Sequence, residues 1–369
     1  MVTLCVKNRC TGCGACQTSC IHHAIEMKVD KFGFKYPKVN NDKCIDCKAC
    51  IHHCPILTPL TYNYPQKSIA CYALDMRERE RSSSGGLATL LAKNIINEKG
   101  VVYGCAFVPP FDIKHIRCTK EEDLEQLRGS KYVQSDITNI YDDIKKDLKN
   151  GLKVLFIGTP CQVAAIKSVS KKAKNLYTID IICHGTPSLR FLLNTLPENI
   201  KKEPIKQIKF RDSNSFHFSL IDKNDKCIYE RSLSNDTYMK GFFNGTIFRT
   251  SCFSCRFARR ERISDITLGD FWGIKSNQIS NKEKGVSLAL INNVVGQELF
   301  DDACIGKAYI EQRSLEEAFF GNEQLNHPFP KTFRVHIFRK LYPYIGYTRA
   351  LCCALPDKML AMKLKNLLK

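Results

Sequence analysis

Twenty cysteines stand in this chain of 369 residues, and eight of them fall into two runs of identical spacing. The spacing C-x2-C-x2-C-x3-C begins at residue 10 and again at residue 44. Runs of this kind ligate two 4Fe–4S clusters, and the fourth cysteine of each run serves the other cluster. Zinc is the alternative, but its sites favour two separated Cys-x-x-Cys pairs. We therefore expect one cluster on Cys10, Cys13, Cys16 and Cys54, and a second on Cys44, Cys47, Cys50 and Cys20.

Four more cysteines stand near predicted strands or in a loop. Cys161 and Cys183 each follow a segment that reads as a buried strand. If these strands are parallel neighbours, both thiols emerge at the carboxyl edge of the sheet, where α/β folds bind ligands. Cys252 and Cys255 form a Cys-x-x-Cys pair in a loop that could fold over this edge. The residues alone leave two alternatives open, a ligand set for a third cluster or four unrelated thiols. The other cysteines read as small buried hydrophobic residues.

The segment SSSGG, residues 82–86, precedes a predicted helix over 87–96. Glycines and capping hydroxyls at a helix start leave backbone N–H groups free, and such groups bind phosphate. An ordinary helix cap has the same composition, so the segment by itself also fits a purely structural role.

The order of expected elements divides the chain. Residues 1–58 carry the cysteine runs, and 59–66 read as a linker. From 67 to 203 strands and helices alternate, whereas 204–325 give a mixed pattern. The expected fold is an α+β ferredoxin-like N-terminal domain, then an α/β domain with a mainly parallel sheet and a mixed C-terminal part. We expect strands over 69–74, 101–107, 153–158, 176–182, 205–210 and 286–292, and helices over 87–96, 121–128, 140–148 and 161–169.

Several motifs occur in a characteristic order: SSSGGLATLL (82–91), RGSKYVQS (128–135), IGTPCQVAAI (157–166), CHG (183–185), CFSC (252–255) and DITLGDFWG (265–273). Together they make the chain resemble the coenzyme F-420 hydrogenase/dehydrogenase beta subunit family, preceded by a bacterial two-cluster ferredoxin domain. The resemblance covers about residues 1–320. It implies bound FAD and a third 4Fe–4S cluster on Cys161, Cys183, Cys252 and Cys255. The expected FAD-binding residues are Ser82, Ser83, Ser84, Gly85, Gly86, Gly129, Ser130, Lys131, Tyr132, Thr159 and Asp270.

These features predict a flavin-dependent iron–sulfur oxidoreductase. FAD would exchange hydride with an organic small molecule, and the clusters would exchange electrons with a ferredoxin-like protein. His184, beside one expected ligand, is the candidate proton donor, although a structural histidine is an equal alternative. A different class of function is a non-catalytic electron-transfer subunit of a larger redox complex. The expected docking site for the partner protein is the set of arginines flanking Cys255, namely Arg256, Arg259, Arg260 and Arg262.

The formal net charge is +19, an excess that often indicates a nucleic-acid partner. Anionic clusters and FAD would offset part of this charge, so we expect no nucleic-acid partner. The sequence shows neither a secretion-signal pattern nor an apolar run of about 18 residues, which predicts a cytoplasmic location.

The final segment, residues 326–369, reads as a basic amphipathic tail. It could lie on the inner face of a membrane, or it could pack back onto the protein. Its expected apolar stripe is Leu360, Leu364, Leu367 and Leu368.

Overall fold

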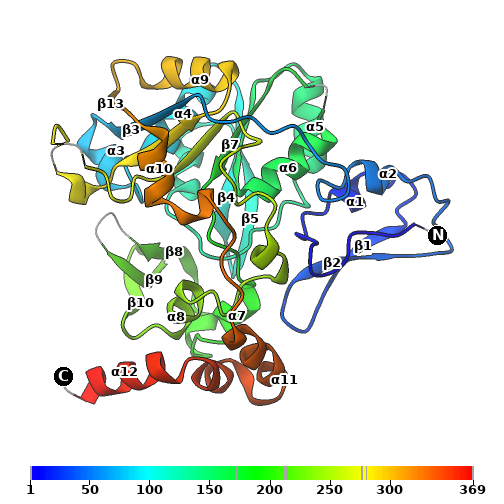
Figure 1. Cartoon of the computed structure of the whole chain (residues 1–369), viewed down its shortest axis with the longest axis vertical. Helices are drawn as coiled ribbons and strands as arrows, with labels where there is room; N and C mark the ends of the chain where they lie inside the picture. The colour runs from blue at the N-terminus through cyan, green and yellow to red at the C-terminus, as the bar shows by residue number, and fades with distance from the viewer. Residues whose placement is uncertain (1, 172, 212–214, 276, 280, 368–369) are drawn as a thin grey trace.

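The computed structural model describes residues 2–171, 173–211, 215–275, 277–279 and 281–367, without the side chains of 363–367. Figure 1 shows a small N-terminal domain beside a large sheet, with a second small sheet and the last two helices below. Among the described residues, no helix is both long and apolar enough to cross a bilayer.

The N-terminal domain is built on an antiparallel hairpin between the two cysteine runs. Strands β1 (Ile25–Val29) and β2 (Lys35–Val39) pair along their length. Each run ends in a one-turn helix, α1 (Ala15–Thr18) or α2 (Ala49–His52), and these two helices pack together. The internal repeat of the sequence is therefore also a repeat of structure.

The large sheet has eight strands in the order β13-β3-β12-β11-β7-β6-β4-β5. Strands β4, β6, β7 and β11 are parallel neighbours, and the other four pairings are antiparallel. The expectation of a mainly parallel sheet is therefore confirmed only for the centre. The strands are β3 (Lys67–Ala73), β4 (Val101–Val108), β5 (Asp112–Cys118), β6 (Val154–Gly158), β7 (Leu176–Ile181), β11 (Ile266–Asp270), β12 (Ser287–Ile291) and β13 (Ala308–Arg313).

Helices cover both faces of this sheet. On one face α4 (Leu87–Asn97) and α9 (Val294–Cys304) bury Leu91 and Phe300 against the strands. On the other face, α5 (Tyr141–Lys149) and α6 (Pro160–Val169) bury Ile144 and Val163. Helix α6 also contacts α1, so it lies between the sheet and the N-terminal domain (Figure 1). The smaller helical segments are α3 (Met76–Glu80), α10 (Leu315–Gly321), η1 (Glu121–Leu127), η3 (Thr250–Ser254), η4 (Lys282–Lys284) and η5 (Glu323–Leu325).

The third part is an antiparallel sheet of β8 (Ile205–Arg211), β9 (Phe216–Asp222) and β10 (Cys227–Ser232), packed with α7 (Leu189–Leu193) and α8 (Thr237–Phe243). A short helix, η2 (Ile200–Lys202), precedes β8. The aromatic core here also includes Phe32 and Phe34 of the N-terminal domain. One hydrophobic core therefore joins the N-terminal and C-terminal parts of the chain.

The segment that the sequence presents as a tail forms two helices, α11 (Phe333–Ala354) and α12 (Pro356–Leu367). Helix α11 buries Phe338 and Tyr342 in the aromatic core. Of the two alternatives, a membrane contact or packing onto the protein, this helix therefore shows packing. In α12, Met359 is buried and Leu360 is exposed. The other residues of the expected stripe, Leu364, Leu367 and Leu368, lie outside the described side chains.

Candidate functional site

The eight cysteines of the two runs line two neighbouring cavities in the N-terminal domain. The first cavity is lined by Cys10, Cys13, Cys16 and Cys54, and the second by Cys20, Cys44, Cys47 and Cys50. Each cavity thus contains the four cysteines that the spacing grouped together, and Cys50 lines both cavities. In each set the thiols surround a space, and no group of three His, Cys, Asp or Glu side chains among the described residues converges on a single-ion site. This donor arrangement fits a bound cluster.

The first cavity has a further cysteine that spacing did not reveal. Cys5 lines this cavity beside Cys54, and its thiol interacts with that of Cys54. Burial raises the pKa of Cys13 to about 12, so its thiolate needs compensating positive charge. An iron cluster supplies such charge through direct ligation.

A third cysteine-lined cavity lies between the N-terminal domain and the large sheet. Cys161 begins the first turn of α6, directly beyond β6, and lines this cavity with Cys252 and Cys255 of the η3 loop. Cys183 follows β7 and interacts electrostatically with these three thiols. Parallel pairing of β6 with β7 brings Cys161 and Cys183 to the carboxyl edge of the sheet, and the η3 loop adds Cys252 and Cys255 there.

Burial dominates the electrostatics of this third group. It raises the pKa of Cys161 to about 12 and that of Cys255 to about 11, in each case with a contribution from the neighbouring thiols. Thr159 lies with its Oγ1 3.2 Å from the Cys161 sulfur, and Thr186 with its Oγ1 3.9 Å from the Cys252 sulfur. Hydroxyl donors of this kind stabilise sulfur that carries negative charge.

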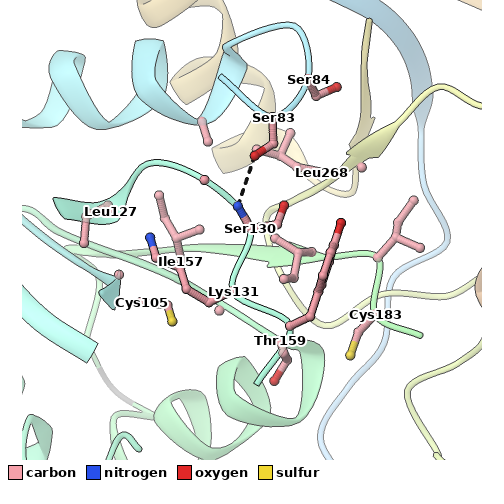
Figure 2. A pocket seen from close by; sticks show the side chains of 18 of the residues that line it. Ser83, Ser84, Cys105, Leu127, Ser130, Lys131, Ile157, Thr159, Cys183 and Leu268 are labelled. Carbon is pink, nitrogen blue, oxygen red and sulfur yellow. Dashed lines mark hydrogen bonds between the residues drawn. The ribbon is translucent and has the colours of Figure 1, made fainter. Parts of the chain in front are cut away.

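A large cavity, of about 350 Å³, opens at the same edge of the sheet. Figure 2 shows the SSSGG segment, residues 82–86 and here called the serine loop, on one side of the cavity, and Thr159 and Cys183 on the other. Because Cys161 and Cys183 line this cavity, it adjoins the third cysteine group directly. The predicted residues that line it are Ser82, Ser83, Ser84, Gly86, Gly129, Ser130, Lys131, Tyr132, Thr159, His184 and Asp270.

Gly85 is the one expected cofactor residue that does not line the cavity. A Cβ atom at this position would lie 2.4 Å from the Cys71 carbonyl oxygen and 2.8 Å from the Ser287 amide. The glycine is therefore needed for close approach to β3 and β12, and its role is to position the serine loop. The sequence motif identified the loop correctly but could not separate lining residues from supporting ones.

A hydrogen bond joins the serine loop to the GSKY segment, residues 129–132, at the cavity wall. The Ser130 amide donates to the Ser83 hydroxyl at 3.0 Å (Figure 2). Behind them Arg128 and Glu78 form a buried ion pair at 2.7 Å. Gly86 caps the start of α4, a helix of 11 residues, so free N–H groups and the positive helix end face this wall. The arrangement suits an anionic ligand.

Cationic and titratable side chains occupy the interior of the cavity. Lys131 donates to the carbonyls of Gln126 and Arg128, and burial lowers its pKa to about 8. Burial also lowers the pKa of His115 to about 4, so this ring is neutral near pH 7. No sequence motif pointed to His115, which hydrogen-bonds the Ile157 carbonyl and lies beside Ser135.

Charged groups also meet at the mouth of the cavity. Arg211 of β8 pairs with Asp270 of β11 at 2.6 Å, which joins the small sheet to the large one. His184 lines the cavity near them. Burial of the His184 ring lowers its pKa, and the negative charge of Asp270 opposes this effect. Arg211 was not expected from the sequence, because β8 carries no recognisable motif.

Comparisons with known proteins agree with the sequence motifs. Residues 9–56 match the model of the 4Fe–4S dicluster domain. Residues 151–318 match the model that describes the C terminus of the beta subunit of coenzyme F420 hydrogenase/dehydrogenase. The predicted resemblance is thereby confirmed. Among curated proteins, the comparison found no match.

A solved structure also resembles the fold: a chain of the F420-reducing NiFe hydrogenase complex from Methanosarcina barkeri, studied by xenon derivatization. It is 16% identical, with a TM-score of 0.48, and the match covers 71% of the present chain and 91% of that chain.

Proposed function

Because the chain joins a 4Fe–4S dicluster domain to the C-terminal part of an F420 hydrogenase/dehydrogenase beta subunit, we propose that it is an iron–sulfur flavoprotein oxidoreductase. Electrons pass between a partner protein and FAD in the large cavity, where an organic substrate is reduced or oxidised. The observation that carries this proposal is the unbroken series of three cysteine-lined cavities ending at the large cavity.

The order of the cysteine groups indicates the route by which electrons would reach the large cavity. Cys50 lines both cavities of the N-terminal domain, so these two are neighbours. Thr11 and Ile56, from the segments that carry Cys10 and Cys54, line the third cavity. Cys161 then belongs to the walls of both the third cavity and the large one. From the N-terminal domain to the large cavity, each cavity thus shares lining residues with the next one.

Bound clusters supply one-electron chemistry, and bound FAD supplies hydride chemistry. The chain's own residues bind, orient and protonate. Amides at the start of α4 and the serine hydroxyls would hold the phosphates of FAD, and Lys131 would add positive charge deeper in the cavity. His184 is neutral at pH 7 because burial lowers its pKa; one ring nitrogen would give its proton to the reduced substrate while the other takes a proton from solvent hydronium.

Flavin binding tests the proposal at the cavity wall. We expect Lys131→Met and Ser83→Ala each to weaken FAD binding about tenfold, about 1.4 kcal/mol, because each removes one polar partner. Flavin fluorescence titration of the anaerobically reconstituted protein measures this. Ser232→Ala, exposed on the small sheet, is the control and should bind FAD like the parent. Unchanged affinity in both cavity variants would remove FAD from this wall.

The donor protein is expected to dock at the second cysteine group instead of the arginine loop. Cys47 is exposed there, and the flanking Ile21 and Ile45 are 80% and 65% exposed. Of the arginines, Arg262 is buried against Asp180, and Arg260 forms a surface ion pair with Glu316. Exposed apolar residues around a surface redox group suit a transient protein interface.

A negative charge introduced at this surface should slow reduction by a partner protein but not reduction by a small chemical reductant. We expect Ile45→Glu to slow reduction by an acidic ferredoxin about tenfold, by like-charge repulsion, while dithionite reduces it normally. Stopped-flow absorbance measures both rates. Val29→Glu changes an exposed residue of β1 and is the control. If both variants react like the parent with ferredoxin, docking occurs elsewhere.

The alternative function is a non-catalytic electron-transfer subunit of a larger redox complex. Phe320, 86% exposed, and Trp272 of the cavity wall offer apolar surface to another subunit. Substrate-dependent reoxidation of the reduced flavin distinguishes the two functions. An isolated chain that reoxidises its flavin with an organic substrate is an enzyme, whereas a relay passes electrons only to another protein.

The proposed membrane contact is now confined to α12. This helix leaves the body of the protein at its C-terminal end (Figure 1), and Lys358 and Leu360 are exposed on it. A basic surface with an exposed leucine suits an anionic lipid face. Phe338 and Tyr342 of α11 are packed in the aromatic core and are not available for this contact.

A further inference from the structure

Arg249 is a buried arginine at the junction between the N-terminal domain and the cavity-bearing part of the chain. It is only 1% exposed. Its backbone amide donates to the Thr186 carbonyl at 2.9 Å, and its own carbonyl accepts from the Cys252 amide at 3.0 Å. The backbone is therefore fixed between the loop that follows Cys183 and the loop that carries Cys252.

The guanidinium reaches across to the N-terminal domain. It donates to the Cys10 carbonyl at 2.8 Å and to the Lys35 carbonyl at 2.7 Å, and it lies 4.2 Å from the centroid of the Tyr36 ring. A third contact joins it to the Gln134 side-chain oxygen at 3.2 Å. A Cβ atom at position 12 would lie 2.7 Å from this guanidinium, which explains the glycine there.

The acceptors of these three hydrogen bonds are all neutral. Among the described side chains, no carboxylate forms an ion pair with Arg249, whereas the equally buried Arg262 pairs with Asp180 at 2.8 Å. An unpaired charge in the protein interior is strongly unfavourable. The fold therefore implies a counter-charge near Arg249 that the protein's carboxylates do not supply.

Two cysteine groups flank this cation. Arg249 lines the third cavity together with Cys161, Cys252 and Cys255. On its other side is the first group, where the guanidinium donates to the carbonyl of the ligand residue Cys10 at 2.8 Å. The cation thus lies between the two places where anionic clusters are proposed to bind.

We infer that Arg249 is a positioning residue that serves as the shared counter-ion of the clusters in the first and third cysteine groups. The inference rests on the proposed function. Its positive charge stabilises the reduced, more negative form of each cluster and so raises both reduction potentials. Its hydrogen bonds to Cys10 and Lys35 also fix the distance between the two groups.

Redox titration monitored by electron paramagnetic resonance tests this on the reconstituted full chain. We expect Arg249→Gln to lower the potentials of two clusters, each by at least a tenfold change in the reduction equilibrium, ~59 mV for one electron. Arg249→Lys, which keeps the charge, should shift them less. Arg190→Gln is the control, because Arg190 also contacts the N-terminal domain, through the Lys31 carbonyl, but lines none of the cysteine cavities.

A second variant keeps the test informative if Arg249→Gln does not fold. Gln134→Glu places a carboxylate beside the intact guanidinium and should lower the same two potentials. Iron content and thermal unfolding confirm that each variant is loaded. Potentials equal to those of the parent, or a shift of one cluster alone, overturn the shared counter-ion. A parent without cluster signals would instead contradict the proposed function itself.

Discussion

Replacing Cys161 by serine is expected to lower the iron content from about twelve to about eight atoms per chain. Cys161 stands in the wall between the third cavity and the large cavity, so its loss removes a ligand from the third group alone. The two groups of the N-terminal domain take all their cysteines from residues 10–54 and should load normally. Iron and sulfide analysis after anaerobic reconstitution gives the count.

The same variant should also lose electron transfer to the flavin. With the third cluster absent, flavin reduction through the partner protein is expected to fall by at least a hundredfold, while direct chemical reduction of the flavin persists. Cys105→Ser is the matched control, because Cys105 lines the large cavity near Lys131 and belongs to none of the three ligand groups. An iron count of about eight in the parent, unchanged by Cys161→Ser, would eliminate the third cluster.

Ending the chain after Lys331 is expected to prevent stable folding. The truncation removes α11, whose Phe338 and Tyr342 pack against Phe191, and Tyr342 also contacts Phe32 of the N-terminal domain. Loss of one such buried aromatic side chain costs about 3–5 kcal/mol, and total stabilities are about 5–15 kcal/mol. Thermal unfolding and cofactor content measure the effect. Phe338→Ala provides the milder test.

A chain ending after Leu355 is the control for this truncation. It keeps α11 and removes only α12, so it should fold and load its clusters, with a melting temperature somewhat below that of the parent because the buried Met359 is lost. The same protein tests the proposed lipid contact, since it should bind anionic vesicles less than the full chain. A folded, fully loaded protein ending at Lys331 would show that α11 is dispensable.

The cysteines that the sequence grouped lie together in the structure, whereas the edges of the large sheet differ from the expected parallel arrangement. Ligand spacing is a local property, so the cysteine runs could be assigned directly. The pattern over 153–182 likewise predicted β6, α6 and β7, because consecutive strands with a helix between them pair in parallel. The serine loop and the GSKY segment were identified by motif, and the structure brings them to one cavity.

The features that sequence could not supply depend on partners far along the chain. Strands β12, β11, β7 and β6 lie between β3 and β4, so these two are not neighbours although only α3 and α4 separate them in the chain. Helix α11 looked like a basic tail because its apolar partners, such as Phe32, stand about 300 residues earlier. Arg249 gave no signal, since its acceptors at Cys10 and Lys35 are backbone carbonyls.

Because β3 pairs with β12 and β13, the large sheet can be completed only late in the synthesis of the chain. All eight cysteines of the first two groups leave the ribosome before β3 does, whereas β12 follows Ala73 by more than 200 residues. At about 5–20 residues per second, that interval lasts about 10–40 s. The N-terminal ligands are thus available to the iron–sulfur delivery machinery while the large sheet is still incomplete. The wall of the large cavity closes only once Asn322 has emerged, so flavin is expected to be captured last.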